Sequence, residues 1–240
     1  MRQRFNQADL FVEERRLAAA GFKRIAGVDE AGRGPLAGPV VAAAVVFPES
    51  VLHTGLPPAL AGLDDSKKLS PAARGLFFER LVAWRELDWG IARVGPDLID
   101  SINILQATHL AMDQALSQLR RQPDHVLIDG LPVPGIGLPQ TAIIKGDARS
   151  FSIAAASVLA KVTRDRIMLE YDRQYPAYGF GRHKGYPTPA HVAALARHGP
   201  CPIHRRSFEP VRAATEHLFA WNTAPSAQAG AGNPRAGAKE

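Results

Sequence analysis

Four carboxylic acids lie where predicted strands end or in the loops just after them. They are Asp29 and Glu30, then Asp129, then Asp147. In open α/β sheets, active sites gather at the carboxyl ends of strands. Carboxylates that are brought close together repel one another, and a hard divalent cation such as Mg²⁺ or Mn²⁺ relieves that repulsion. The four acids together therefore predict a metal site.

The chemistry that such a site supports is phosphoryl transfer. Two divalent cations about 4 Å apart activate a water and stabilise the leaving oxygen of an in-line displacement. Positioning and charge neutralisation supply most of the catalysis, so neither a histidine base nor a covalent nucleophile is needed. Taken singly, each acid would more often be a helix cap or a solvated loop residue. Taken together, the residues indicate a metal-dependent phosphodiesterase that acts on nucleic acid.

Asp29 and Glu30 are consecutive, which constrains the strand that carries them. Neighbouring residues of a regular strand point to opposite faces, so both acids reach one metal only if the strand ends or bulges there. Gly27 and Gly32 flank the pair and would permit such a departure. We expect Asp29 to be the bridging ligand.

An alternation of strands and helices must position these acids. Apolar runs predict strands over residues 22–31, 40–47, 89–94, 125–129 and 141–144. Helical spacing and capping residues predict helices over residues 8–20, 70–84, 97–119, 152–171, 189–197 and 210–220. Ser150 or Ser152 is expected to cap the second long helix. The order predicts an α/β fold with a mixed sheet flanked by helices.

The chain divides into four expected segments. Residues 1–20 form an N-terminal helical segment, and residues 21–175 form the catalytic core. Residues 176–221, rich in Gly, Pro, His and Arg, form a small helical C-terminal extension. Residues 222–240 contain almost no large apolar side chain, so we expect a disordered tail.

Composition narrows the class of protein. The 240 residues carry 29 Lys and Arg against 23 Asp and Glu, a net charge of +6 that suits a polyanionic partner without locating a basic patch. The single cysteine, Cys201, excludes an internal disulfide, a thiolate zinc site and an iron–sulfur cluster. No export signal and no apolar run of about 20 residues is present. We therefore expect a cytoplasmic protein with no membrane partner.

Six motifs, in order along the chain, resemble those of the type 2 ribonucleases H, the ribonuclease HII family. The motifs are GVDEAGRGPLAGPV at 27–40, DSKKLS at 65–70, LIDG at 127–130, KGDARSFSIAAASVLAKVTRDRIM at 145–168, HKGYPT at 183–188 and HGPCPIHRRSF at 198–208. The resemblance covers about residues 20 to 210. It implies a ribonuclease H-like fold in which residues 176–221 bind substrate.

The resemblance also implies roles for individual residues. The four acids match the metal-binding catalytic acids of the family. Gly32, Arg33 and Gly34 match the element that recognises the 2′-hydroxyl beside the scissile phosphate through backbone groups, and glycines permit that close approach. Tyr186 matches the tyrosine that stacks on the sugar of the following nucleotide. Without this context, the glycines would indicate only a turn, and the tyrosine only loop packing.

Ser66 and Lys67 are expected to contact phosphate near the site, because the DSKKLS segment resembles such a loop in the family. A solvated charge run is the alternative, and Lys67 is preferred to Lys68 without a strong reason. Asp165 belongs to a shared motif but is interpreted as a structural ion-pair residue, since two arginines flank it and it lies some 20 Å along the helix from the predicted metal site.

Basic residues of the C-terminal part are interpreted as contacts to a duplex. They are His183, His198 and His204 with Arg182, Arg197, Arg205 and Arg206, and Lys161 and Arg164 of the long helix are candidates for the same surface. The histidines do not show the spacing of metal ligands on a helix.

The activity implied is hydrolysis on the 5′ side of a ribonucleotide, giving a 3′-hydroxyl and a 5′-phosphate. The implied substrates are RNA/DNA hybrids and duplex DNA with embedded ribonucleotides, with Mg²⁺ or Mn²⁺ as cofactor and a monomer as the expected state. A non-catalytic hybrid-binding module remains an alternative, although all four acids are present. A type 3 ribonuclease H would carry a further N-terminal domain, and a junction resolvase would lack Tyr186 and residues 32–34. The tail shows no sliding-clamp motif.

Overall fold

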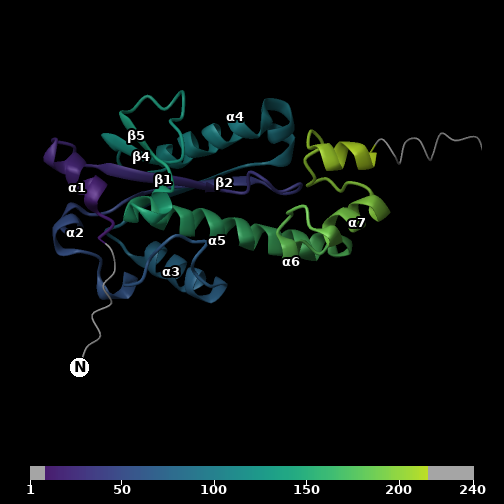
Figure 1. Ribbon diagram of the computed structural model, residues 1–240, viewed down its shortest axis with the longest axis horizontal. Helices are drawn as coiled ribbons and strands as arrows, with labels where there is room; N and C mark the ends of the chain where they lie inside the picture. Colours follow the sequence, from purple (N-terminus) through teal and green to yellow (C-terminus); the bar gives the residue numbers. More distant parts are fainter. Residues whose placement is uncertain (1–8, 216–240) are drawn as a thin grey trace, which may run out of the picture.

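A five-stranded mixed sheet forms the centre of the protein. The computed structural model describes residues 9–215, and its sheet has the order β3-β2-β1-β4-β5 (Figure 1). The strands are β1 (Ile25–Ala31), β2 (Val40–Val46), β3 (Asp88–Val94), β4 (His125–Asp129) and β5 (Gln140–Ile143). The first three strands are antiparallel, whereas β4 and β5 run parallel to β1. The predicted α/β class with a mixed sheet is confirmed.

Helices cover both faces of this sheet. One face packs against α4 (Pro96–Ser117), and the other packs against α5 (Phe151–Gln174), with α3 (Pro71–Ala83) outside α5 (Figure 1). The strand β2 is buried along all seven residues, as its run of valines and alanines predicts for a strand covered on both sides. The two largest clusters of buried apolar residues therefore lie one on each side of the sheet.

The beginning of α5 lies against β1 at very short range. A Cβ atom on Gly27 would lie 2.2 Å from the backbone carbon of Ser152, so only glycine permits this packing. The hydroxyl of Ser150 accepts a hydrogen bond from the amide of Ile153 at 3.2 Å, which makes Ser150 rather than Ser152 the cap of α5. Glu14 of α1 (Val12–Ala19) is buried and accepts hydrogen bonds from Ser150 and Ser152.

The helix predicted as continuous over residues 97–119 is interrupted. Asn103 has φ 67° and ψ 164°, which are not helical values, so α4 consists of two helical pieces. The Asn103 side chain accepts hydrogen bonds from the amides of Leu105 and Gln106 and thereby caps the second piece. The short helices α2 (Glu49–Thr54) and α6 (Phe180–His183) were not predicted either; single helical turns are too short to show a periodicity.

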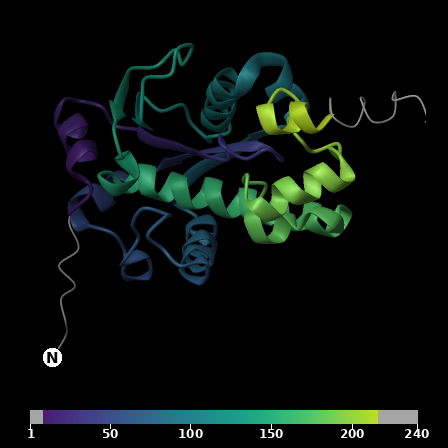
Figure 2. The ribbon, with the colours of Figure 1, turned by 45° about the vertical axis from the view of Figure 1, so that its right-hand side comes forward.

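The C-terminal extension packs around the far end of α5. It contains α6, α7 (Pro189–His198) and a helical stretch over residues 209–215 (Figure 2). The last residues of the helix predicted over 210–220 and the tail over 222–240 lie outside the described residues, as do residues 1–8. Within residues 9–215, no helix is long and apolar enough to cross a membrane.

Candidate active site

Three of the four predicted acids meet at one edge of the sheet. Asp29 lies near the end of β1, Asp129 ends β4, and Asp147 lies in the 3-10 turn Gly146–Ala148 that precedes α5. One carboxylate oxygen from each lies within 4.8 Å of the others. Asp29 and Asp147 are each 3% exposed, whereas Asp129 is half-buried.

The parallel pairing of β1 with β4 brings these acids together. Val28 pairs with Ile128, so Asp29 and Asp129, the next residue on each strand, lie side by side. Backbone amides hold both carboxylates: the amide of Glu30 donates to Asp29 Oδ1 at 2.7 Å, and the amide of Gly146 donates to Asp129 Oδ1 at 2.7 Å. These two acids are therefore held in place by backbone amides.

The electrostatics of this group favour a bound cation. Burial, together with repulsion from Glu30 and Asp129, raises the pKa of Asp29 well above its ordinary value. Burial also raises the pKa of Asp129, although the Gly146 amide counteracts that shift. Grouped, desolvated carboxylate oxygens are the hard donors that Mg²⁺ and Mn²⁺ prefer, so the residues present fit a divalent metal.

Glu30 leaves β1 on the face opposite to Asp29, because the ladder with β2 is regular along all of β1. The departure that Gly27 and Gly32 would permit is therefore absent between the two acids. Glu30 lies outside the group of three and pairs with Arg33, with Nη1 and Oε1 3.4 Å apart. Burial raises its pKa, Arg33 counteracts this shift, and Asp129 adds to it, so Glu30 borders the group.

Lys67 and Ser66 reach the site in different ways. The Nζ of Lys67 lies 2.8 Å from Asp147 Oδ2, and this hydrogen bond raises the pKa of Lys67. Lys68 instead pairs with Asp64 at the surface, so the preference for Lys67 has a structural reason. Ser66 is buried, and its hydroxyl lies 2.8 Å from that of Ser157, which itself bonds Asp29. Its hydroxyl is therefore turned inward, toward Ser157.

The Gly32–Gly34 segment and Tyr186 lie next to each other at the same end of the molecule. A Cβ atom on Gly34 would lie 3.8 Å from Tyr186 Cε1, and Tyr186 is 42% exposed. The two segments are joined by a hydrogen bond of 2.8 Å from the amide of Leu36 to the carbonyl of Gly185. Gly34 and Tyr186, 152 positions apart in the chain, thus lie on one exposed surface.

Some residues interpreted as duplex contacts are buried. Arg164, His204 and Arg205 are each at most 1% exposed, so the interpretation is wrong for them. Arg182, Arg197 and Arg206 are exposed, as is His198. The arginines and histidines of this region look alike in the sequence, and only the packing of the extension separates the two groups.

Asp165 forms an ion pair, as expected, but its partner differs from the flanking arginines. Lys161 Nζ lies 2.7 Å from Asp165 Oδ1, one helical turn earlier. Arg166 pairs instead with Glu79 of α3, and Arg164 turns inward. Asp165 is not among the residues grouped at the metal site.

Comparisons with known proteins identify the family. The model of the family described as Ribonuclease HII matches residues 26–211. Ribonuclease HII of Syntrophotalea carbinolica is 54% identical over 202 residues, 83% of this chain and 91% of that protein. Ribonuclease HII of Moorella thermoacetica is 53% identical over 83% of this chain and 93% of that protein.

Solved structures show the same fold. The ribonuclease H2 from Pyrococcus horikoshii has a TM-score of 0.70 at 30% identity and covers 82% of this chain and 99% of its own. A ribonuclease HII from Archaeoglobus fulgidus, solved in a complex with PCNA, has a TM-score of 0.62 at 26% identity and covers 78% of this chain and 96% of its own. The protein therefore belongs to the ribonuclease HII family, divalent-metal-dependent endoribonucleases that act on RNA paired with DNA.

Proposed function

We propose that this ribonuclease H cuts the phosphodiester on the 5′ side of a ribonucleotide, both in RNA/DNA hybrids and at single ribonucleotides within duplex DNA. The products are a 3′-hydroxyl and a 5′-phosphate. The observation that carries the proposal is the contact between Gly34 and Tyr186, because the Gly32–Gly34 segment begins three residues after Asp29 of the acidic group. A backbone surface for one sugar and an aromatic ring for the next suit the junction between a ribonucleotide and a deoxynucleotide.

The acids are the residues that would hold the metals. Asp29, Asp129 and Asp147 supply grouped oxygens, and Asp29 is central because both Glu30 and Asp129 act on its pKa. Glu30 lies outside the group but close enough for Asp129 to raise its pKa, so we propose that it would serve a second cation rather than the one held by Asp29. Divalent cations at such a site supply an activated water and neutralise the charge that develops on the phosphate.

The remaining residues bind and orient the substrate. Gly32, Arg33 and Gly34 offer backbone groups to the 2′-hydroxyl, and Tyr186 stacks on the following sugar. Lys67 reaches Asp147, where its charge also attracts the scissile phosphate. Ser66 acts indirectly, because its hydroxyl contacts Ser157 rather than solvent. The exposed residues Arg182, Arg197 and Arg206 remain proposed contacts to the duplex backbone.

The direct test uses a labelled DNA duplex that contains one ribonucleotide, an all-DNA duplex, and an RNA/DNA hybrid, each with Mg²⁺, Mn²⁺ or EDTA. We expect a metal-dependent cut 5′ of the single ribonucleotide, with a 5′-phosphate on the downstream product, and cuts along the hybrid. Binding of the ribonucleotide duplex without a cut under either metal would favour the non-catalytic binding module. A cut in the all-DNA duplex would contradict the role given to residues 32–34.

A further inference from the structure

Two fully buried arginines contact the Gly32–Gly34 segment on the side that faces the protein interior. Arg164, on α5, is 1% exposed, and Arg205, in the segment after α7, is 0% exposed. Among residues 9–215, neither guanidinium forms an ion pair with a carboxylate. Burial lowers the pKa of Arg164 to about 10 and that of Arg205 to about 9. Unpaired charges are costly to bury, so some other requirement keeps them there.

Each arginine donates three hydrogen bonds, and all six acceptors are backbone carbonyls. Arg205 bonds the carbonyls of Gly32 at 2.5 Å, Arg33 at 2.9 Å and Gly38 at 3.0 Å. Arg164 bonds the carbonyls of Pro39 at 3.0 Å, Ala37 at 3.1 Å and Lys184 at 2.9 Å. Five of the six carbonyls belong to residues 32–39, and the sixth lies two residues before Tyr186.

Fixing a carbonyl also fixes the amide that follows it. In a trans peptide the C=O of one residue and the N–H of the next point in opposite directions. The carbonyls of Gly32 and Arg33 point to Arg205, so the amides of Arg33 and Gly34 point away from it. Arg33 and Gly34 are exposed, and within the described part of the chain neither amide donates to another protein group. These two donors are thus held ready for a group outside the protein.

Arg164 joins this segment to the one that carries Tyr186. It bonds carbonyls on both segments, and its Cζ lies 5.9 Å from the centroid of the Tyr186 ring. The Arg164 side chain also occupies the space that a side chain on Gly32 would need, because a Cβ atom there would lie 2.1 Å from Arg164 Nε. A change at Arg164 would therefore disturb both surfaces, whereas the three side-chain hydrogen bonds of Arg205 all go to carbonyls of the first segment.

We propose that Arg164 and Arg205 are positioning residues that set sugar discrimination: Arg205 orients the amides of Arg33 and Gly34, and Arg164 fixes that segment relative to Tyr186. The inference rests on the proposed function, because it assumes that these two surfaces read the ribonucleotide and the sugar after it. Neither arginine touches the substrate. Both act through backbone carbonyls.

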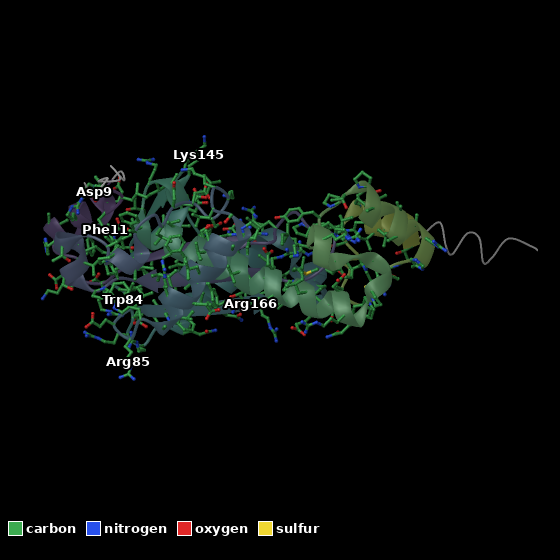
Figure 3. The ribbon with its side chains drawn as sticks, turned by 90° about the horizontal axis from the view of Figure 1, so that it is seen from below. Asp9, Phe11, Trp84, Arg85, Lys145 and Arg166 are labelled. Atoms are coloured by element: carbon green, nitrogen blue, oxygen red, sulfur yellow. The ribbon has the colours of Figure 1, made fainter. Side chains whose placement is uncertain are left out.

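The test compares Arg205→Lys and Arg164→Lys with the matched control Arg166→Lys. Lysine keeps the charge but cannot bond three carbonyls in one plane. Arg166, labelled in Figure 3, is on the same helix as Arg164 but pairs with Glu79 of α3, 2.5 Å away. Dissociation constants are measured by fluorescence anisotropy with Ca²⁺ in place of Mg²⁺, on three duplexes: all-DNA, one ribonucleotide followed by a deoxynucleotide, and one followed by a second ribonucleotide.

Two ratios of dissociation constants measure sugar discrimination, one at the Gly32–Gly34 segment and the other at Tyr186. The first ratio is the dissociation constant of the all-DNA duplex divided by that of the single-ribonucleotide duplex, and the second compares a ribonucleotide with a deoxynucleotide at the following position. We expect Arg205→Lys to lower the first ratio about tenfold, the effect of one lost hydrogen bond, and to leave the second unchanged. Arg164→Lys lowers both ratios, and Arg166→Lys lowers neither. Partial unfolding would reduce the active fraction without changing either ratio.

A second measurement needs no substrate. The amides of Leu36 and Gly38 bond the carbonyls of Gly185 and Ile203, so their hydrogen exchange reports how firmly the segment is held. We expect faster exchange in both lysine variants and no change in Arg166→Lys. If Arg205→Lys does not fold, Arg205→Gln replaces it.

The outcomes separate the two claims. If the wild-type protein binds all three duplexes equally, the proposed function fails. Amide hydrogen exchange alone then decides whether the two arginines hold the Gly32–Gly34 segment in place. If the wild-type protein discriminates and both lysine variants keep both ratios, the positioning role is overturned while the proposed function stands.

Discussion

Gly32 and Gly34 lie two residues apart, yet different physical demands act on them. Gly32 has φ +100°, and the Arg164 side chain occupies the space where its Cβ would lie. Gly34 has an ordinary φ, and a Cβ there would meet Tyr186 only at van der Waals distance. The interior of the protein therefore requires Gly32, whereas nothing inside the protein requires Gly34, where our proposal places a sugar against the exposed backbone.

Replacing each glycine by alanine separates these demands. We expect Gly32→Ala to lower the free energy of unfolding by about 1–3 kcal/mol, because of its positive φ and the clash with Arg164. Gly34→Ala should change that free energy by no more than about 0.5 kcal/mol while lowering kcat/KM on the single-ribonucleotide duplex. Urea unfolding and cleavage assays measure the two effects. Full activity in folded Gly34→Ala would contradict close approach of the sugar at this residue.

At the scale of elements, the site depends on how closely α5 approaches the sheet. Asp147 lies in the turn before α5, and Asp29 lies on β1, so their separation is set by the packing of helix on strand at Gly27. Glu14 supports the same place from α1 by bonding the first turn of α5. The metal group is therefore sensitive to changes in packing that touch none of its acids.

Gly27→Ala tests this dependence. The new Cβ would lie 2.2 Å from backbone carbon Ser152 C and 2.4 Å from Ile153 N, neither of which is a flexible side-chain end. We expect a loss of about 3 kcal/mol in the free energy of unfolding, together with weaker Mn²⁺ binding as α5 shifts. The control is Gly75→Ala in α3, where nothing lies within 4 Å and helix propensity predicts a gain of about 0.5–1 kcal/mol. Equal stability of the two variants would contradict the packing argument.

The extension contains a buried hydrogen-bonded chain that ends at Tyr186. The Cys201 amide donates to His204 Nδ1 at 3.0 Å, the Nε2 atoms of His204 and His191 are 3.1 Å apart, and His191 Nδ1 lies 2.9 Å from the Tyr186 carbonyl. A carbonyl only accepts, so His191 must donate from Nδ1 and accept at Nε2 from His204. Each ring is then neutral, and a proton added to either would place two donors face to face.

Stability should therefore fall in mild acid. Burial, with smaller contributions from His191 and Arg206, lowers the pKa of His204 to about 4. The unfolded chain, with a histidine pKa of about 6.5, binds the proton first, so the free energy of unfolding decreases as pH falls from about 6.5 to 4, by about 3 kcal/mol in total. Urea unfolding at several pH values measures this slope. We expect His204→Gln to reduce it, and an identical slope in the variant would contradict the assignment.

At the scale of the whole molecule, the pattern of apolar residues predicts the sheet and its long helices. Buried positions recur at helical spacing in a helix and form a continuous run in a strand that is covered on both faces. The continuous run in β2 and the strand-end positions of Asp29 and Asp129 could both be read in this way. The break at Asn103 could not, because the apolar spacing continues through it. The positions of Arg164 and Arg205 could not either, since a long polar side chain looks the same in sequence whether it binds DNA or backbone carbonyls.

The central claim is that the buried acids perform the cleavage while a separate surface selects the sugar. The most direct measurement is single-turnover cleavage and binding of the single-ribonucleotide duplex by wild type, Asp29→Asn and the control Asp165→Asn, whose acid pairs with Lys161. We expect Asp29→Asn to bind the duplex but cut it about 10³-fold more slowly, as several kcal/mol of charge stabilisation is lost. Asp165→Asn should cut at the wild-type rate. Wild-type cleavage by Asp29→Asn would contradict the account.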